Sequence, residues 1–285
     1  MSTEPPYDLD ALLPAAIARK AEALGVAKTR MDVWSLMTLA VLGGAFIALG
    51  GMFATTVLAG ADGVVPFGIA RLLSGLVFCL GLILVVVGGA ELFTGNTLMV
   101  MAWAAGEVRL SEVLRAWAIV YVGNFIGAVG TAGLVFLSGQ YLSGKGSVAL
   151  VAVSIAVGKV SLSFDYAFFL GILCNVLVCL AVWLAYGARS TADKILAVLF
   201  PVSAFVVAGF EHSVANMYLI PLGLFIKAAA PAALWTQLGA AAPHLDTLTW
   251  PAFFVSLVPV TLGNIVGGGG LVGAVYWFIY LRKRA

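Results

Sequence analysis

The sequence predicts an all-α integral membrane protein with six transmembrane helices. Hydrophobic residues make up 62% of the chain, charged residues only 10%, and the mean hydropathy is +1.10, which excludes an ordinary soluble domain. Six apolar segments are each as long as the roughly 20 residues that a helix needs to cross a bilayer. They span residues 33–58, 68–106, 116–138, 165–187, 195–228 and 251–281. Polar residues interrupt the second and the fifth of these segments.

The residues before the first apolar segment predict an amphipathic helix. Apolar side chains recur there at helical spacing between charged ones, which is typical of a helix on a membrane surface or on the protein body. They are Leu13, Ile17, Ala21 and Leu24. The segment lacks a basic stretch followed by an apolar core, so we do not expect a signal peptide. We expect a cytoplasmic N-terminal helix in 1–30, a six-helix transmembrane channel domain in 31–281 and a short cytoplasmic tail in 282–285.

The positive charges predict the orientation. An even number of crossings places both termini on one side of the membrane. The N-terminal arm, the linkers after the second and fourth segments and the tail carry all of the 15 Lys and Arg residues except Arg71, Lys145, Lys159 and Lys227. By the positive-inside rule, both termini face the cytoplasm. The net charge of +2 gives no indication of nucleic-acid binding.

The interrupted segments share a pattern that predicts an internal repeat. GAELFTGNTLMV in the second and GFEHSVANMYLI in the fifth both contain Gly-x-Glu-x4-Asn. The matching residues are Gly89, Glu91 and Asn96 in the first copy and Gly209, Glu211 and Asn216 in the second. One crossing later, GNFIG at 123–127 matches GNIVG at 263–267. Because three crossings are an odd number, two sets of three must insert in opposite orientations, giving a 3+3 inverted repeat with broken helices 2 and 5.

Polar groups at these interruptions need a reason, because an unpaired polar group in hydrocarbon costs several kcal/mol. Irregular backbone at membrane depth is tolerated where it lines a cavity, and the freed N–H groups of a half-helix attract anions. Glu91 and Glu211 are equally consistent with bracing the freed amides and with a transport role. His212 favours a functional role, since a backbone brace needs no titratable ring.

Several segments resemble the signature sequences of the formate/nitrite transporter family. They are ELFTGNT, GFEHSVANMYLIPLG, LGNIVGGGGLVGAVYWFIYLR, YDLDALLPAAIARKAEALGVAK and GILCNVLVCLAVWLAYGARSTADK. The resemblance covers essentially the whole chain. It implies an aquaporin-like protomer in the bacterial cytoplasmic (inner) membrane, assembled as a homopentamer with one pathway per subunit.

The resemblance also implies the site residues. The central histidine falls on His212 and the threonine facing it on Thr94. The supporting residues fall on Glu211, Asn175 and Lys159, and the apolar constrictions on Phe78, Leu82, Phe93 and Phe205. Lys159 and Asn175 taken alone are equally consistent with a snorkelling lysine and with interhelical hydrogen bonding.

The implied function is passage of a small monovalent weak-acid anion, for which formate is the favoured substrate and nitrite, hydrosulfide or a short carboxylate the alternatives. Such an anion cannot cross apolar rings while charged, so a proton partner is expected. Histidine, with an unperturbed pKa of ~6.5, is the side chain suited to handle it. Channel and proton-symport mechanisms both remain open.

Two other classes of function are disfavoured. An aquaporin-like neutral-solute channel is expected to carry an Asn-Pro-Ala motif at each break, and neither break has one. An enzyme is not expected, because the chain has only two histidines, with His244 in a polar loop, and no nucleophile motif at a break. The cysteines, Cys79, Cys174 and Cys179, fall in apolar segments and predict packing residues. We expect neither a metal nor a cofactor.

Overall fold

The computed structural model describes residues 10–238 and 245–282, and within these ranges the chain is helical with no strands. Six apolar helices are long enough to cross a membrane, which confirms the six predicted segments. They are α2 (Val33–Leu58), α3 (Phe67–Gly88), α6 (Leu110–Leu137), α8 (Phe164–Gly187), α9 (Thr191–Ala208) and the continuous helix formed by α12 (Trp250–Ile265), η4 (Val266–Ala274) and α13 (Val275–Tyr280).

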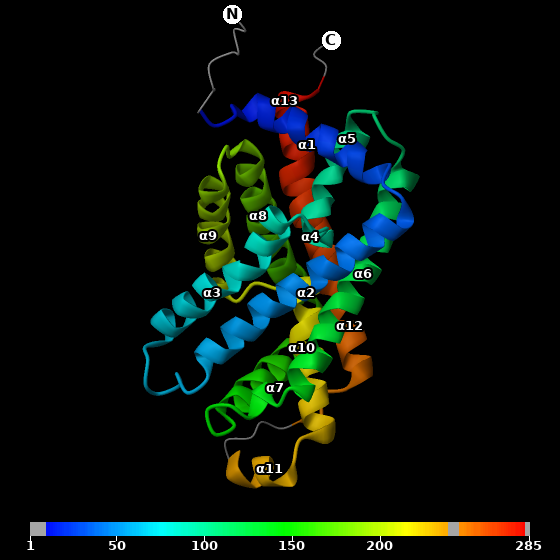
Figure 1. Cartoon of the computed structure of the whole chain (residues 1–285). Helices are drawn as coiled ribbons and strands as arrows, with labels where there is room; N and C mark the ends of the chain where they lie inside the picture. Colours follow the sequence, from blue (N-terminus) through cyan, green and yellow to red (C-terminus); the bar gives the residue numbers. More distant parts are fainter. Residues whose placement is uncertain (1–9, 239–244, 283–285) are drawn as a thin grey trace, which may run out of the picture.

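The remaining described elements are shorter. They are α1 (Pro14–Thr29), α4 (Phe93–Asn96), η1 (Thr97–Met99), α5 (Val100–Ala104), η2 (Gln140–Leu142), α7 (Ser147–Val160), α10 (Ser213–Ala229) and α11 (Ala232–Leu238). Both ends of the described chain lie at the same end of the molecule, where α1 crosses over α5 and α13 (Figure 1). The linker between α2 and α3 lies toward the opposite end (Figure 1).

Two stretches of non-helical backbone separate helices within the second and fifth predicted segments. α3 ends at Gly88 and a helix resumes at Phe93, while α9 ends at Ala208 and a helix resumes at Ser213. Each interruption begins with a glycine in the left-handed region, Gly89 at φ 81° and Gly209 at φ 74°. Only glycine adopts this conformation without a steric cost, so the glycine of each repeated motif is what ends the preceding helix.

α1 (Pro14–Thr29) lies within the segment expected to form the N-terminal helix, but its buried side differs from the expected stripe. Ile17 and Ala21 are buried, and Gly25 and Thr29 continue the same side toward the C-terminal end of α1. Leu13 is 76% exposed because it caps the helix instead of packing under it.

Two elements were not predicted from the sequence. α7 contains 14 residues and is too short to cross a bilayer alone. η4 is π-helical over nine residues and includes the glycine run GGGG. A side chain at Gly268 would collide with Thr97, Asn175 and Cys179, so this helix passes the interrupted region at backbone distance.

Candidate functional site

His212 and Thr94 meet at the centre of the molecule, one from each non-helical region. Both are buried, with 2% and 0% exposure, and His212 Nε2 lies 3.1 Å from Thr94 Oγ1. His212 also caps α10, because its Nδ1 accepts a hydrogen bond from Ala215 N at 3.0 Å. Since Nδ1 is an acceptor, the neutral ring carries its proton on Nε2 and donates it to Thr94 Oγ1. The contact brings together the two residues that the resemblance paired.

Aromatic and aliphatic side chains narrow the space beside His212. The Phe205 ring is nearly parallel to the imidazole at 5.9 Å between centroids, and Phe78 meets Phe205 edge-on at 5.7 Å. Leu82 and Val178 line the same narrow space. Three of the four residues expected at the constrictions therefore surround His212.

Phe93 lies apart from that group. It belongs to α4, beyond the end of α3, so it does not share a helix with Phe78 and Leu82. Its ring packs edge-on against Trp117 at 6.0 Å and Tyr121 at 4.9 Å.

A buried ion pair flanks the second interruption. Lys159 Nζ, at the end of α7, donates to Glu211 Oε1 at 2.8 Å, and Asn216 Nδ2 donates to Glu211 Oε2 at 2.7 Å. The side chains of Lys159 and Glu211 are 16% and 5% exposed. The predicted grouping of Lys159 with Glu211 is thus present, although Lys159 contacts the glutamate and not the histidine ring.

A second buried ion pair flanks the first interruption in the same way. Lys28 Nζ lies 2.9 Å from Glu91 Oε2 and donates to Asn96 Oδ1 at 2.7 Å, while Asn96 Nδ2 donates to Glu91 Oε2 at 2.7 Å. Sequence reasoning missed Lys28. A usable signal was present, because Lys28 stands four residues before Asp32, the N-cap of α2, just as Lys159 stands four before the N-cap of α8.

Two asparagines hold the non-helical backbone in place. Asn124 Oδ1 accepts from Phe93 N at 2.8 Å, and its Nδ2 donates to the carbonyls of Ala40 at 2.7 Å and Glu91 at 2.9 Å. Asn264 makes the corresponding set, accepting from Ser213 N at 2.9 Å and donating to the carbonyls of Gly171 at 2.8 Å and Glu211 at 3.0 Å. These are the asparagines of GNFIG and GNIVG. Each satisfies one N–H and one carbonyl of an interruption, and also binds a carbonyl in the interior of a neighbouring helix, α2 or α8.

Asn175 supports the loop that carries Thr94. Its Nδ2 donates to Thr94 O at 3.2 Å, Thr97 Oγ1 at 3.1 Å and Asn264 O at 2.6 Å. The contacts fit a positioning role toward Thr94, and they include none to the His212 ring.

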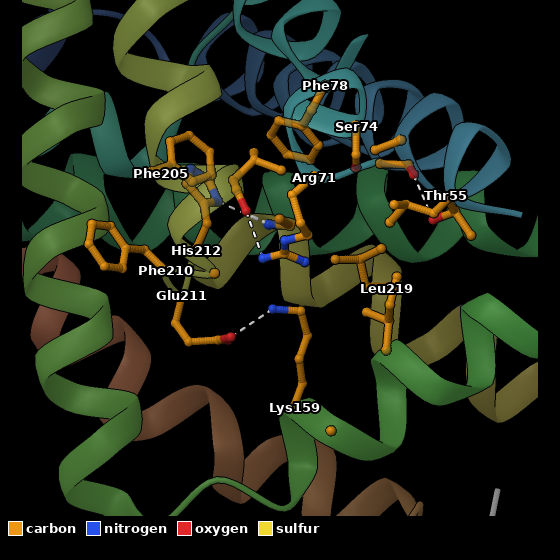
Figure 2. A pocket seen from close by; sticks show the side chains of 18 of the residues that line it. Thr55, Arg71, Ser74, Phe78, Lys159, Phe205, Phe210, Glu211, His212 and Leu219 are labelled. Carbon is orange, nitrogen blue, oxygen red and sulfur yellow. Dashed lines mark hydrogen bonds and ion pairs between the residues drawn. The ribbon is translucent and has the colours of Figure 1, made fainter. Parts of the chain in front are cut away.

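A cavity of about 280 Å³, here called the vestibule, leads to His212 from the end of the molecule away from the termini. Its walls come from the second half of α2, the first half of α3, α7 and the backbone around Gly209. Its charged lining residues are Arg71, Lys159 and Glu211 (Figure 2). A much smaller space lies on the terminus side of the interruptions, beside Lys28, Asn96 and Tyr186.

No group of three potential metal ligands occurs in the described residues 10–238 and 245–282. All three cysteines are buried and free, as the sequence predicted. His244 lies outside the described residues.

Comparison with known proteins places the chain in a family. The formate/nitrite transporter family model matches residues 15–278. The chain is 44% identical to the formate channel FocA of Escherichia coli (strain K12), over 100% of this chain and 99% of that protein. Its structure resembles a pentameric formate channel with formate bound, with a TM-score of 0.82, 42% identity, and coverage of 88% of this chain and 98% of that one.

A second solved structure, an FNT family ion channel, matches with a TM-score of 0.80 and 29% identity, over 93% of this chain and 98% of that chain. These relatives are channels of a transporter family, in agreement with the expectation that the chain is not an enzyme. On this evidence the chain is a membrane protein that belongs to the formate/nitrite transporter family.

Proposed function

We propose that this chain is a formate channel that works as a homopentamer in the bacterial cytoplasmic membrane, with both termini in the cytoplasm. The similarity to FocA over the full length and to the formate-bound pentamer supports the substrate and the assembly. The single observation that carries the proposal is the buried His212–Thr94 contact, which sits behind an apolar constriction at the end of a charged vestibule. The distribution of Lys and Arg supports the orientation.

We further propose that the protomer is an inverted repeat in which α1 to α6 correspond to α7 to α12, with one broken helix in each half. Four pairs of residues with matching contacts support it: Lys28 and Lys159, Glu91 and Glu211, Asn96 and Asn216, Asn124 and Asn264. In this arrangement α1 corresponds to α7, so the repeat unit contains four elements instead of three crossings. The cytoplasmic helix of residues 1–30 is then part of the repeat, ahead of the channel domain in 31–281 and the tail in 282–285.

The barrier to transport is the charge of the substrate. Formic acid has a pKa of ~4, similar to an Asp side chain, so at pH 7 nearly all of it is formate. The rings of Phe78 and Phe205 offer no hydrogen bonds to replace the hydration of an anion. Neutral formic acid meets a far smaller penalty, so protonation beside the constriction removes the main obstacle.

His212 is placed to supply that proton, and its hydrogen bonds show what must be broken for the ring to do so. A neutral ring that released its Nε2 proton would become an imidazolate, so the donor must be the imidazolium. Forming it requires a proton on Nδ1, which displaces the hydrogen bond from Ala215 N. The negative charge of an anion at Nε2 stabilises the positive ring, so we infer that proton and anion enter the site together. Thr94 orients the anion through its hydroxyl hydrogen, which is not used in accepting from His212.

The other residues prepare the site. Lys159 attracts the anion to the vestibule, while its pairing with Glu211 keeps the buried carboxylate from repelling the substrate. Asn175 fixes the Thr94 loop. The constriction is formed by Phe78, Leu82 and Phe205, and Phe93 closes the path on the side of the first interruption.

Flux into proteoliposomes tests the proposal. Purified protein in liposomes should carry formate faster than protein-free liposomes, and faster than acetate or lactate. Nitrite and hydrosulfide are measured in parallel, because the sequence left both as alternative substrates and the family takes its name from formate and nitrite. A chain that carries no formate, or that carries water and glycerol at higher rates than any weak-acid anion, would refute a formate channel.

A further inference from the structure

Arg71 is a second cation in the vestibule, and the proposed transport mechanism does not use it. It lies near the start of α3, while Lys159 lies at the end of α7, and both line the cavity in front of His212 (Figure 2). A partly buried arginine in an apolar helix is costly unless it has partners and a use.

Backbone carbonyls hold the guanidinium in a fixed position. Arg71 Nη2 donates to Val206 O at 2.7 Å, and Nε donates to Val207 O at 3.4 Å. Both carbonyls belong to the last turn of α9, directly before Gly209, and Val206 O also accepts a hydrogen bond from Gly209 N at 3.1 Å. Nη1 makes no hydrogen bond to any residue within 10–238 and 245–282. The guanidinium is therefore anchored at one edge and available at the other.

Of the two positive charges that line the vestibule, that of Arg71 is the one without a carboxylate partner. Among the lining residues, Arg71 and Lys159 are positive and Glu211 is negative, which gives a net charge of +1 while His212 is neutral. Glu211 already binds Lys159 and Asn216. No carboxylate of the described residues lies within ion-pair distance of Arg71. A cavity with one excess positive charge suits a single monovalent anion.

The spacing along α3 places this charge outside the constriction. Arg71, Ser74 and Phe78 occupy positions i, i+3 and i+7 and line the same cavity. Seven residues of helix correspond to about 10 Å, so Arg71 lies two turns before the Phe78 ring. An anion at Arg71 has reached the vestibule but has not yet lost its water to the apolar rings.

We propose that Arg71 forms an outer binding station for a small planar carboxylate, which it captures from the side opposite the termini before the anion reaches His212. The inference rests on the proposed formate-channel function and adds a specificity-determining residue to it. A guanidinium presents paired N–H groups that match the two oxygens of a carboxylate, and it stays charged throughout the pH range of transport. Lys159, a point charge engaged by Glu211, lacks that geometry.

The competing explanation is that Arg71 only latches α3 to the end of α9. Two variants separate the explanations. Arg71→Gln removes the charge but retains a side-chain N–H at about the position of Nε, which binds Val207 O in the wild type, and Arg71→Lys keeps the charge but loses the planar fork. Lys145→Asn is the matched control. It removes an exposed positive charge outside the vestibule, and asparagine tolerates the left-handed backbone found there at φ 55°.

Initial rates of formate uptake are measured against formate concentration in right-side-out and in inverted membrane vesicles. The host must lack formate channels of its own, and an N-terminal tag tested with protease reports which face is outside. Arg71→Gln should raise the half-saturating formate concentration about five- to tenfold from the face opposite the termini, as expected for loss of one charged hydrogen bond in a wet cavity. It should leave that concentration unchanged from the terminus face. Arg71→Lys should fall between, and Lys145→Asn should match wild type.

High salt should shrink the difference between wild type and Arg71→Gln, because screening weakens capture by charge. The proposal is overturned if Arg71→Gln keeps the wild-type half-saturating concentration from both faces. It is also overturned if both Arg71 variants lower only the maximal rate, as a latch would. Wild-type vesicles that take up no formate from either face would instead refute the proposed function itself.

Discussion

The two buried ion pairs use the same residue types but differ in how fully they are satisfied. In the first, Lys28 donates to both Glu91 and Asn96, and the adjoining space is small. In the second, Lys159 reaches Glu211 but not Asn216, whose Oδ1 has no partner in the described part of the chain. The second pair also lines the 280 Å³ vestibule. The first pair is therefore fully hydrogen-bonded within the protein, whereas the second borders the cavity and leaves the neighbouring Asn216 Oδ1 without a partner in the described residues.

The largest effect is expected at Asn124 and Asn264, the two asparagines that bind the non-helical backbone after α3 and α9. Asn124→Leu and Asn264→Leu each leave one N–H and one carbonyl of the non-helical backbone buried without the asparagine that binds them, which should cost about 3 kcal/mol or more of stability. Both variants should fail to give stable pentamers in detergent, as judged by size-exclusion chromatography. If one leucine variant assembled normally, the equivalence of the two halves would be lost.

The next largest effect should be a difference in stability between variants that lack Lys28 and variants that lack Lys159. Lys28→Met and Lys159→Met each strand a buried carboxylate, at a cost of about 3 kcal/mol. Lys28→Met also removes the hydrogen bond to Asn96, so it should cost about 1 kcal/mol more. Thermal unfolding in one detergent measures the difference. Equal midpoints, or a lower midpoint for Lys159→Met, would contradict the contrast between the two sites.

Formate flux should rank Lys28→Met and Lys159→Met in the opposite order to their stability, with the larger loss of flux in Lys159→Met. Lys159 lines the vestibule, so at a temperature where both variants are folded Lys159→Met should lower flux about tenfold or more, as loss of an attracting charge in a partly desolvated site predicts. Lys28→Met should retain more flux despite its lower stability. Flux losses that simply follow the unfolding midpoints would show that both lysines serve stability alone.

The smallest effect should come from the caps that follow the two lysines. The Asp32 carboxylate accepts from Trp34 N and Ser35 N, both at 3.0 Å, whereas Ser163 Oγ accepts from Tyr166 N at 3.5 Å. Asp32→Ala should therefore lower the unfolding midpoint more than Ser163→Ala.

The Asp32 contribution should also depend on pH. The hydrogen bonds from Ser35 lower the pKa of this carboxyl below its usual value. Its stabilising effect is then present above the unfolded pKa and is lost as pH falls through the folded one. Wild type and Asp32→Ala should converge in acid, and a constant difference down to pH 3 would exclude the ionised cap.

The sequence predicted those features that leave a hydrophobic segment or a repeated motif. Apolar runs longer than a bilayer crossing predicted all six apolar helices. The shared Gly-x-Glu-x4-Asn pattern falls on the two non-helical stretches that begin at Gly89 and Gly209, and that these are paired breaks of a repeat stays a prediction. The pairing of His212 with Thr94 came from the family resemblance, and the structure places the two in contact.

The features that were not predicted have no comparable sequence pattern. Lys28 lies on a helix classified by amphipathic pattern, and its contact with Glu91 joins residues 63 positions apart. α7 is too short to register as a crossing, and the glycines of η4 have no side chains whose spacing could indicate a π-helix. Arg71 was counted only toward the orientation of the chain, because nothing in the sequence near it indicates a contact with the end of α9.

The central claim is that His212 handles the proton, and the pH dependence of formate flux through His212→Asn tests it most directly. Asparagine keeps a polar group that can cap α10 through its side-chain oxygen but cannot exchange a proton near neutrality. Flux is measured from pH 5 to 8 in liposomes containing equal amounts of folded protein. Wild type should show an inflection in this range, and the variant should lose it and become either a blocked pore or a less selective anion leak. Superimposable pH profiles for the two proteins would leave His212 as a helix cap and contradict the account.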